Sequence, residues 1–557
     1  MEKNAFIAVI ISLLILILYN QFVSRWYEPP PSSQPAQEKV GRVTPPPAVS
    51  SELSQPRRTP DQPPQKTRAI ASDVPAREVK VETDRYVAVF TNRGARMKSF
   101  RLNHYRMSLD EQSPPFEMIS STPGVPYPLG IELNDPAPFN DKDLMYNIKG
   151  NHLTLTGDDK EILTFEGRTP SGSLLTKKLT FSGASYVIEL DIGIAGMTRE
   201  SAAPRLLLSS EKGKQPPNRD APFEGLLGLV DGELIRETAE KAAKEGLKSG
   251  QVDWAGFGYT YFLFAMLPEM ETEPGKIARQ SLTVKQREPG ILLGMQSQNR
   301  TAPGGNTSYR LFVGPKDLKV LEEAGGGLDQ SINFGTFLYL FSLHFIVLPF
   351  LQILRFSHGF TGSYGIDIIL LTLLIKLLLA PLTHKSFVSM KQMQKLQPQM
   401  QRIKDKFKDD REKMNKEVME LYKRNKVNPL GGCFPMLLQL PVFIGLYNAL
   451  STPIELRHTP FLWIKDLSRP DWESLPFSLG GWELGIPVLV LLMGASMFLQ
   501  QWMTPTAGDP NQKRLMYMMP VVFTVMFVSF PAGLTIYWFV NNVLTIGQQY
   551  LINRMTR

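Results

Sequence analysis

A lysine in the middle of an apolar run most constrains what this chain of 557 residues can fold into. Lys376 lies within Ile366–Leu382, and at about 1.5 Å per residue it is roughly 15 Å from Ile366, near the middle of a ~30 Å hydrocarbon layer. An ammonium group at that depth is costly unless it faces water or a partner. Asp367 is half a turn out of phase, and the other apolar runs contain no acid in their interiors. We therefore expect a functional site in a hydrated cavity inside the membrane.

Six apolar segments are long enough to be membrane spans, because a crossing helix needs about 20 residues. They are Asn4–Val23, Tyr364–Thr383, Gly432–Leu450, Leu484–Met503, Leu515–Phe530 and Leu534–Ile552. No small-x-small cleavage site and no lipobox cysteine follows the first, so we predict an uncleaved transmembrane anchor over 1–24. The other five predict an α-helical membrane core over 361–557.

A further apolar segment, Thr336–Leu354, is predicted not to cross. A crossing there would place the basic segment after Lys376 on the same side as the domain that precedes the core. We therefore predict an interfacial amphipathic helix within 331–360, broken at Pro349. With six crossings both termini are expected on the cytoplasmic side, as the positive-inside rule requires for the basic loops and tail.

The segment between the second and third spans is polar and has helical periodicity. Its part from Ser386 to Asn428 holds twelve basic residues against six acidic ones. We predict a cytoplasmic helical hairpin over 384–427 that turns near Lys408–Asp410. Methionine adapts to irregular apolar partners, so we predict that five methionines recruit unfolded apolar segments; the alternative is that they form the packing seam of the two helices. They are Met390, Met393, Met400, Met414 and Met419.

A large β domain precedes the membrane core. Residues 25–76 are rich in proline, serine, glutamine and charge, which predicts a disordered, extended linker. From 77 to 330, short strand patterns are separated by Gly/Pro turns, as in the hairpins predicted at Tyr86–Leu102 and Leu174–Ile192. Short helices are expected at Ala239–Leu247 and Lys316–Ala324. These patterns predict one β-sandwich domain.

The sequence carries no recognisable catalytic set. Its one cysteine, Cys433, excludes an internal disulfide and a multi-cysteine metal site. The β domain has no His/Asp/Glu set with metal spacing, no nucleophile elbow and no phosphate loop. We therefore predict a protein that is not an enzyme and needs no cofactor or metal.

Three classes of function remain to be compared. An anchored periplasmic enzyme would need the catalytic set that is missing. A polytopic transporter with a periplasmic ligand-binding domain would be expected to show inverted repeats or an acid relay, and neither is visible. A membrane chaperone or insertase needs a hydrated groove for a polar segment beside an apolar flank, and the sequence supplies both. The insertase is the favoured reading, and the transporter is the alternative.

Two motifs carry a family resemblance. Asn428-Pro-Leu-Gly-Gly-Cys-Phe-Pro435, continued by Leu437-Leu-Gln-Leu-Pro441, and Phe530-Pro-Ala-Gly-Leu534 resemble the Oxa/Alb/YidC insertase family. The resemblance is strong from about Phe334 to Leu551. It implies a multi-pass protein of the bacterial inner membrane that inserts and helps fold other membrane proteins, alone or with the Sec translocon. It also implies a periplasmic β-super-sandwich of the galactose-mutarotase type.

The resemblance further implies a positive residue in a groove open to the cytoplasm and to lipid. Lys376 occupies that position, where the family commonly has arginine. The expected partners are nascent inner-membrane proteins, the Sec translocon and the lipid bilayer; the short tail after Ile552 predicts only a weak ribosome contact, and no DNA is expected. The linker and the interfacial helix should isolate the β domain mechanically. The predicted substrate groove is lined by Lys376, Thr372, Gln439, Tyr537, Trp538 and Asn541.

Overall fold

The structure is a computed structural model that describes residues 74–555 with gaps. The gaps are 111, 120–121, 134–137, 197–200, 212–222, 248, 270–278, 288, 299, 302–304, 333–335, 338–340, 343, 409, 426, 428–433, 452, 475, 480–481 and 505–509. The predicted anchor, nearly all of the predicted linker, and Cys433 with most of the first family motif lie outside the described residues. The described part belongs to one compact unit, 69–557.

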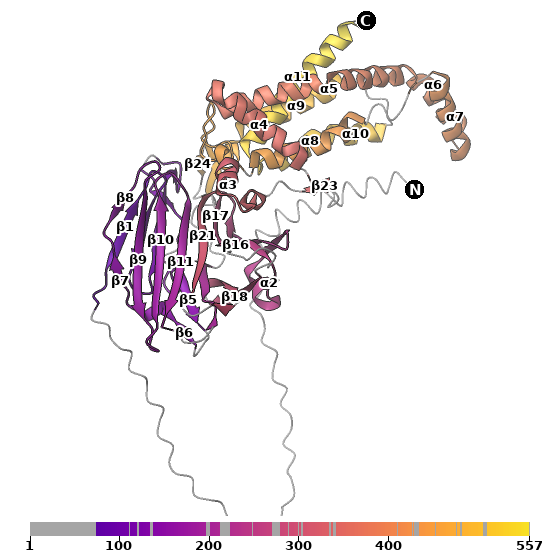
Figure 1. The fold of residues 1–557 in the computed structure, drawn as a ribbon. Coiled ribbons are helices and arrows are strands. Elements are labelled where there is room, and N and C mark those ends of the chain that lie inside the picture. The colour runs from indigo at the N-terminus through magenta and orange to yellow at the C-terminus, as the bar shows by residue number, and fades with distance from the viewer. Residues whose placement is uncertain are drawn as a thin grey trace, which may run out of the picture. The chain divides into compact units, whose positions relative to one another are not determined.

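The first part of this unit consists of sheets that are antiparallel except for the parallel pair β1–β8 (Figure 1). The strands are β1 Glu78–Glu82, β2 Tyr86–Thr91, β3 Arg96–Arg106, β4 Pro115–Glu117, β5 Gly130–Leu133, β6 Phe139–Asn140, β7 Asn147–Lys149, β8 Leu153–Thr154, β9 Lys160–Arg168, β10 Leu174–Ser182, β11 Val187–Ala195, β12 Ser201–Ala202, β13 Arg205–Glu211, β14 Phe223–Val230, β15 Glu233–Glu237, β16 Val252–Tyr259, β17 Phe262–Glu269, β18 Gln280–Arg287, β19 Gly290–Ser297, β20 Arg300–Thr301 and β21 Asn306–Pro315. A nine-stranded sheet has the order β15-β14-β16-β17-β21-β11-β10-β9-β7, and the two five-stranded sheets are β4-β3-β2-β1-β8 and β18-β19-β13-β5-β6.

Alternating apolar residues explain these strands. In β11 every second side chain is buried, and β10 pairs with β11 in the predicted hairpin from Leu174↔Ala195 onward. In the β2–β3 hairpin the turn needs Gly94, whose φ is +72°, a conformation that side chains with a Cβ rarely adopt. Phe90 packs against Phe165 and Phe181 from the neighbouring sheet, with ring centroids 6.4 and 5.5 Å apart. The predicted short helices are confirmed as α2 Ala239–Glu245 and α3 Leu318–Ala324.

The second part of the unit is helical. Its helices are α4 His344–Thr361, α5 Tyr364–Lys395, α6 Gln397–Lys406, α7 Arg411–Arg424, α8 Phe434–Ser451, α9 Val488–Met503, α10 Pro510–Phe527 and α11 Ala532–Met555. Short strands β22 Thr336–Phe337, β23 Phe341–Ser342, β24 Pro476–Leu479 and β25 Trp482–Gly485 precede α4 and α9, and 3-10 turns occur at Ile454–Leu456 and Asp471–Ser474. Among the described residues, α5 alone is both long and apolar enough to cross a membrane by itself; shorter apolar helices lie at Phe345–Thr361, Val488–Met503 and Met516–Phe527.

The observed helix α4 differs from the helix predicted within 331–360. It begins only at His344, ends at Thr361, and continues through Pro349, so the predicted break there is wrong. Pro349 is the sixth residue of α4, so it removes the hydrogen bond that its N–H would otherwise donate to the Phe345 carbonyl, and such a proline can kink a helix without ending it. One face is buried through Val347, Leu351 and Leu354, while the opposite face exposes the rings of three phenylalanines. These are Phe345, Phe356 and Phe360.

The hairpin after α5 turns where the sequence predicts. α6 ends at Lys406 and α7 begins at Arg411, on either side of Lys408–Asp410. However, α5 does not end near Thr383: it continues to Lys395, through Pro381. The base of the hairpin is therefore a direct helical extension of the span that carries Lys376 (Figure 1).

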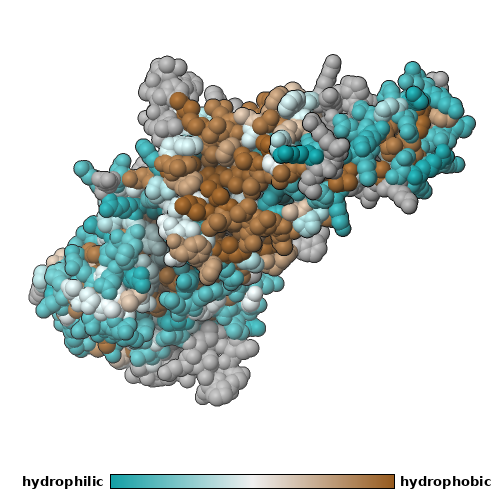
Figure 2. Space-filling view, turned by 90° about the horizontal axis from the view of Figure 1, so that it is seen from above, coloured by the Kyte–Doolittle hydropathy of each residue, from teal (hydrophilic) through white to brown (hydrophobic). Residues whose placement is uncertain are grey.

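Surface hydropathy separates the two kinds of structure. Figure 2 shows apolar surface gathered over the helical body, whereas the surfaces of the sheets and of the α6–α7 hairpin are mainly hydrophilic. Exposed apolar side chains on α5, α9 and α10 include Leu378, Leu491 and Val525. Large exposed apolar surfaces mark contact with lipid or with other proteins. The helical body therefore has the surface of a membrane domain.

The β domain is not mechanically isolated, contrary to the expectation. Its buried core continues through Val347 and Leu351 of α4 and Ala449 of α8. Arg457, which follows α8, donates from Nη2 to the Arg106 carbonyl at 2.8 Å. Its guanidinium also lies over the rings of three aromatic residues, Phe116, Tyr261 and Phe262, at 5.6–6.0 Å.

We expect Arg457→Met to lower the melting temperature of the purified protein, because it removes the cation–π contacts and a buried hydrogen bond that together contribute roughly 1–3 kcal/mol. Arg457→Lys should recover part of the loss. Lys160→Ala, which changes an exposed cation at the start of β9, serves as the control and should unfold at the wild-type temperature. Equal melting temperatures for Arg457→Met and the control would show that this contact does not stabilise the fold.

Candidate functional site

The polar side chains of the helical body converge on α11. This helix packs against α5, α8 and α9. It begins directly after Pro531, which cannot continue a preceding helix, and the Thr535 hydroxyl donates to the Pro531 carbonyl at 3.3 Å. Polar residues then recur three or four positions apart along it, so they form two neighbouring stripes, one toward α5 and one toward α9. They are Asn541, Thr545 and Gln548 toward α5, with Asn542 and Gln549 toward α9.

Lys376 faces this polar stripe. Its ammonium donates to the Thr545 hydroxyl at 2.6 Å, and the Thr545 hydroxyl in turn donates to the Asn541 carbonyl at 2.6 Å. The lysine is half-buried, between the packed interior and the exposed apolar side chains Leu377 and Leu378. In the part of the chain that the structure describes, Lys376 has no acidic partner. A cation held only by a hydroxyl remains available to an anion that arrives from outside.

The nearest acid on the same helix is already engaged. Asp367 is fully buried, accepts from the Thr361 hydroxyl at 2.6 Å, and lies 3.0 Å from Nδ1 of His358. These contacts join α4 to the first turn of α5, where a carboxylate is favourable. Asp367 is therefore not a counter-ion for Lys376.

The seam between α5 and α11 continues past Lys376. Gln548 donates from Nε2 to the Thr383 hydroxyl at 3.0 Å and to the Ala380 carbonyl at 3.4 Å. The Thr383 hydroxyl also donates to the Leu379 carbonyl at 3.1 Å. These bonds flank Pro381, which removes one N–H from the helix ladder, and polar side chains of neighbours commonly satisfy backbone groups near such a proline. The result is a polar track along one face of α5.

Other predicted groove residues lie on the remaining sides of α11. The Gln439 amide of α8 donates to the Tyr537 hydroxyl. Trp538 packs in an aromatic cluster with Phe443, Phe523 and Phe527, at centroid distances of 5.1–5.7 Å. Thr372 is buried, and its hydroxyl donates to the Ile368 carbonyl of its own helix at 2.6 Å. Thr545 links Lys376 to the main-chain carbonyl of Asn541, whereas Gln439–Tyr537, Trp538 and Thr372 form separate contacts.

Several polar contacts were not singled out from the sequence. Asn542 donates to the Ser496 hydroxyl at 3.0 Å, and Gln549 donates to the Thr504 hydroxyl at 3.0 Å, so α9 is joined to α11 twice. The sequence analysis missed Gln548 and Gln549, whereas Asn542 stands out in the sequence as one of several scattered polar residues on the spans. The signal was present as a spacing of three to four residues from Asn541 through Thr545 to Gln548, which continues the stripe beyond the lysine.

The predicted hairpin methionines have different environments. Met400 is buried between α6 and α7, and the Tyr422 hydroxyl donates to its sulfur at 3.2 Å. Met419 is half exposed, whereas Met390, Met393 and Met414 are intermediate. Met400 therefore belongs to the packing seam, and Met419 is the methionine that the hairpin presents most openly.

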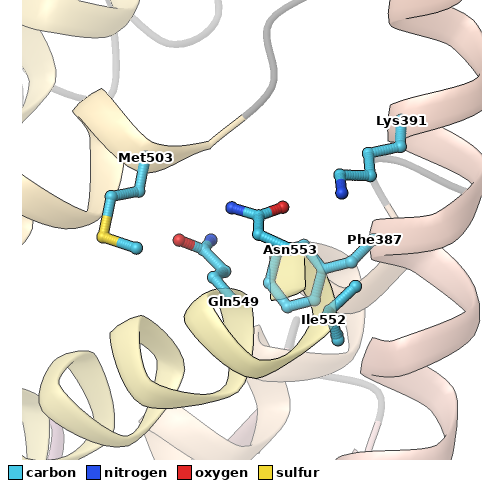
Figure 3. A pocket seen from close by; sticks show the side chains of 6 residues that line it. All are labelled: Phe387, Lys391, Met503, Gln549, Ile552 and Asn553. Carbon is cyan, nitrogen blue, oxygen red and sulfur yellow. The ribbon is translucent and has the colours of Figure 1, made fainter. Parts of the chain in front are cut away.

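A small pocket opens where α5, α9 and α11 meet (Figure 3). It is lined by Phe387, Lys391, Met503, Gln549, Ile552 and Asn553. Phe387 and Lys391 continue the face of α5 that carries Lys376 and Thr383, because they follow at helical spacing. The polar track thus ends at a second cation.

The β domain contains a buried charged cluster whose members pair with one another. Lys177 lies 2.7 Å from Asp141 and donates to the carbonyls of Gly94 and Leu129, and Arg96 also pairs with Asp141, at 2.8 Å. Burial lowers the pKa of Lys177 to about 8, against the opposing effect of Asp141. Among the described residues no group of three or more His, Cys, Asp or Glu side chains could hold a metal. This cluster is a structural joint between sheets.

Comparisons with known proteins cover the whole chain. Residues 78–352 match the model of the YidC periplasmic domain, and 356–557 match that of the 60Kd inner membrane protein family. The membrane protein insertase YidC of Syntrophus aciditrophicus is 36% identical over 575 residues, with 100% of both chains covered. The same protein of Pelobacter propionicus is 38% identical over 582 residues, covering 100% of this chain and 99% of its own. A crystal structure of an active YidC insertase with its first transmembrane domain resolved is 17% identical, with a TM-score of 0.36, over 85% of this chain and 92% of that one.

Proposed function

This chain belongs to the Oxa/Alb/YidC family and is a multi-pass membrane protein insertase with a periplasmic domain, and from that premise we propose that it works by transient capture at the seam of α5 and α11. The seam receives the polar or acidic extramembrane part of a nascent membrane protein. The apolar part of the substrate moves along the exposed apolar flank of α5 into lipid. The transporter alternative has no support from these relatives.

The contact between Lys376 and Thr545 carries the proposal. A cation near mid-membrane whose one hydrogen-bond partner among the described residues is a hydroxyl offers its charge to a passing anion. The polar track from Lys376 to Gln548 shortens the apolar barrier that a polar segment must cross. The exposed Leu377 and Leu378 lie beside the lysine and supply the flank toward lipid. Burial of the apolar segment in lipid supplies the driving force, and no nucleotide is needed.

The proposal includes an orientation and partners. With the β domain in the periplasm, the basic α6–α7 hairpin and both termini lie in the cytoplasm, as the positive-inside rule favours. The hairpin receives substrates as they leave the ribosome. The insertase acts alone on single- and double-spanning proteins and together with the Sec translocon on larger ones.

The direct test is capture of a nascent chain inside the membrane. A photoreactive residue at position 376 should crosslink a ribosome-bound single-span substrate in membranes that contain the full-length protein. The control is the same probe at Leu371, which lies five residues earlier on α5 and is buried in the helical core. Equal yields at the two positions, or none at 376 in a protein that still inserts the substrate, would exclude capture at this seam.

A further inference from the structure

The first half of α5 is packed tightly against the rest of the helical body. The Phe461 ring lies so close to Gly365 that a Cβ on this glycine would stand 2.1 Å from a ring carbon. Ile368 is only 1% exposed, and its Cδ1 lies 3.2 Å from the place of a Cβ on Gly533, at the start of α11. Interiors packed in this way resist displacement. At this end, therefore, α5 and α11 do not move apart without opening the core.

The second half of α5 has a weak point at Pro381. Proline has no N–H to donate to the Leu377 carbonyl, so one bond of the helix is missing. Side chains support the neighbouring backbone instead. The Thr383 hydroxyl bonds to two carbonyls of the preceding turn at 3.1 Å, and Gln548 of α11 donates to one of these, the Ala380 carbonyl, at 3.4 Å. Because helices kink most readily at proline, α5 can bend at Pro381 when the bonds from Gln548 break.

Two matched side-chain bonds join this level of α11 to its neighbours. Gln548 donates to the Thr383 hydroxyl of α5 at 3.0 Å. The next residue, Gln549, lies on the α9 side (Figure 3) and donates to the Thr504 hydroxyl at the end of α9, also at 3.0 Å. Gln549 is only 3% exposed, whereas Gln548 is half-buried and Pro381 is exposed. The bond to α9 therefore lies in the packed interior, and the bond to α5 lies at the open side of α11.

The part of α5 beyond Pro381 carries the α6–α7 hairpin. α5 continues to Lys395, and α6 begins at Gln397 (Figure 1). Because the helix is continuous, a displacement of the hairpin reaches the α5–α11 seam as a bend at Pro381. The bond between Gln548 and Thr383 spans that bend. It joins two uncharged groups, and such bonds contribute little net free energy, so it can break and form again.

We propose that the bond between Thr383 and Gln548 is a latch on the seam and that Pro381 is its hinge. Binding of a nascent chain by the hairpin bends α5, opens the latch and admits the polar part of the chain to Lys376. This inference rests on the proposed capture at the α5–α11 seam and adds the step that controls entry. The hairpin must bind the nascent chain better in the bent state, because only differential binding shifts such an equilibrium.

The test locks one seam at a time in the full-length protein. Thr383→Cys with Gln548→Cys, in a chain that also carries Cys433→Ser, is joined by a short reducible bis-thiosulfonate reagent. Locking this pair should lower insertion of a single-span substrate in proteoliposomes about fivefold or more, as expected when a gating motion is blocked. A reducing agent should restore the activity. The matched control is Thr504→Cys with Gln549→Cys, which locks α11 to α9 and should insert at the same rate with and without the crosslink.

A second measurement identifies the step that the lock blocks. Photoreactive residues at 376 and at 419 report nascent chain at the seam and at the hairpin. In the protein locked at 383 and 548, crosslinking from 376 should be lost while crosslinking from 419 persists. Full insertion by this locked protein, or equal losses from the two locks, would overturn the latch and leave capture at Lys376 standing. Absence of crosslinks from 376 in the reduced, active protein would overturn capture and the latch together.

Pro381→Ala tests the hinge without cysteines. Alanine restores the missing N–H and favours the straight helix, so insertion should slow about threefold although the melting temperature does not fall. A loss of activity without a loss of stability separates a hinge from a merely structural proline. Unchanged insertion by Pro381→Ala would overturn the hinge.

Discussion

Lys376→Glu should nearly abolish insertion of substrates whose translocated segment is acidic, whereas Lys376→Arg should preserve it. Arginine keeps the sign of the charge and is harder to neutralise than lysine. Opposite charges about 4 Å apart attract by about 1 kcal/mol in water and about 4 kcal/mol at an effective dielectric constant near 20. Lys376→Ala removes this attraction, and Lys376→Glu replaces it by repulsion. We therefore expect the glutamate variant to insert the acidic substrate with a yield roughly tenfold or more below that of the wild type, and clearly below that of the alanine variant.

The measurement is the yield of inserted substrate in proteoliposomes, with matched substrates that differ only in the charge of the translocated segment. With a substrate whose translocated segment is neutral, the difference in insertion yield between the alanine and glutamate variants should become smaller. Lys385→Glu, which changes an exposed cation nine residues further along α5, should retain activity. If the alanine and glutamate variants insert the acidic substrate equally well, the charge of Lys376 has no part in capture.

Thiol labelling distinguishes the groove from a purely structural lysine. A cysteine at position 376 should react with a water-soluble thiol reagent added from the cytoplasmic side, because the polar track joins this position to the pocket at Lys391. Cysteines at Ile368, which is packed in the core, and at Leu379 should react slowly. A lysine that only bonds to Thr545 for stability predicts poor labelling at 376 and a less stable alanine variant. Labelling at 376 no faster than at the two controls, in an active protein, would exclude a hydrated groove.

The sequence predicted the helical elements because their signals are local. Apolar runs and the Pro531–Gly533 turn placed α8, α9, α10 and α11 within a few residues of their observed bounds, and alternation placed the hairpins of the β domain. Local patterns also identified Lys376 as unpaired by any acid on its own helix. Its partner Thr545 was present among many polar residues, but hydropathy cannot tell which face of α11 meets α5.

One error concerns the effect of a proline within a helix, and the others concern contacts between segments that are far apart in the sequence. The predicted break at Pro349 is wrong because α4 continues through it: an interior proline removes one hydrogen bond and can kink a helix without ending it. The β domain was predicted to be mechanically separate because its flanking linker is long, and a single arginine after α8 has no sequence pattern that reveals its aromatic partners. Gln549 was missed for the same reason, since its bond to Thr504 joins positions 45 residues apart.

Removal of the hairpin should separate recruitment from folding. Replacing 397–424 with a short Gly/Ser joint deletes α6 and α7, which pack on each other and follow directly on the end of α5. The helical body should therefore keep its melting temperature, while insertion falls about fivefold or more, since cytoplasmic capture is lost. Insertion yield and thermal unfolding are measured on the same preparation.

Two methionines sharpen this prediction, because they differ in burial on the same hairpin. Met419→Gln changes an exposed apolar side chain, so it should reduce crosslinking of nascent chains to the hairpin and leave its stability unchanged. Met400→Gln places an amide in the seam beside Tyr422, so it should loosen the hairpin, seen as faster amide hydrogen exchange in α6 and α7. A fully active deletion would remove the recruitment role. A different outcome is that the insertion activity of both single variants falls only as far as their amide hydrogen-exchange protection in α6 and α7 falls. In that case the methionines serve to pack the hairpin, and substrates are recruited through its charged surface.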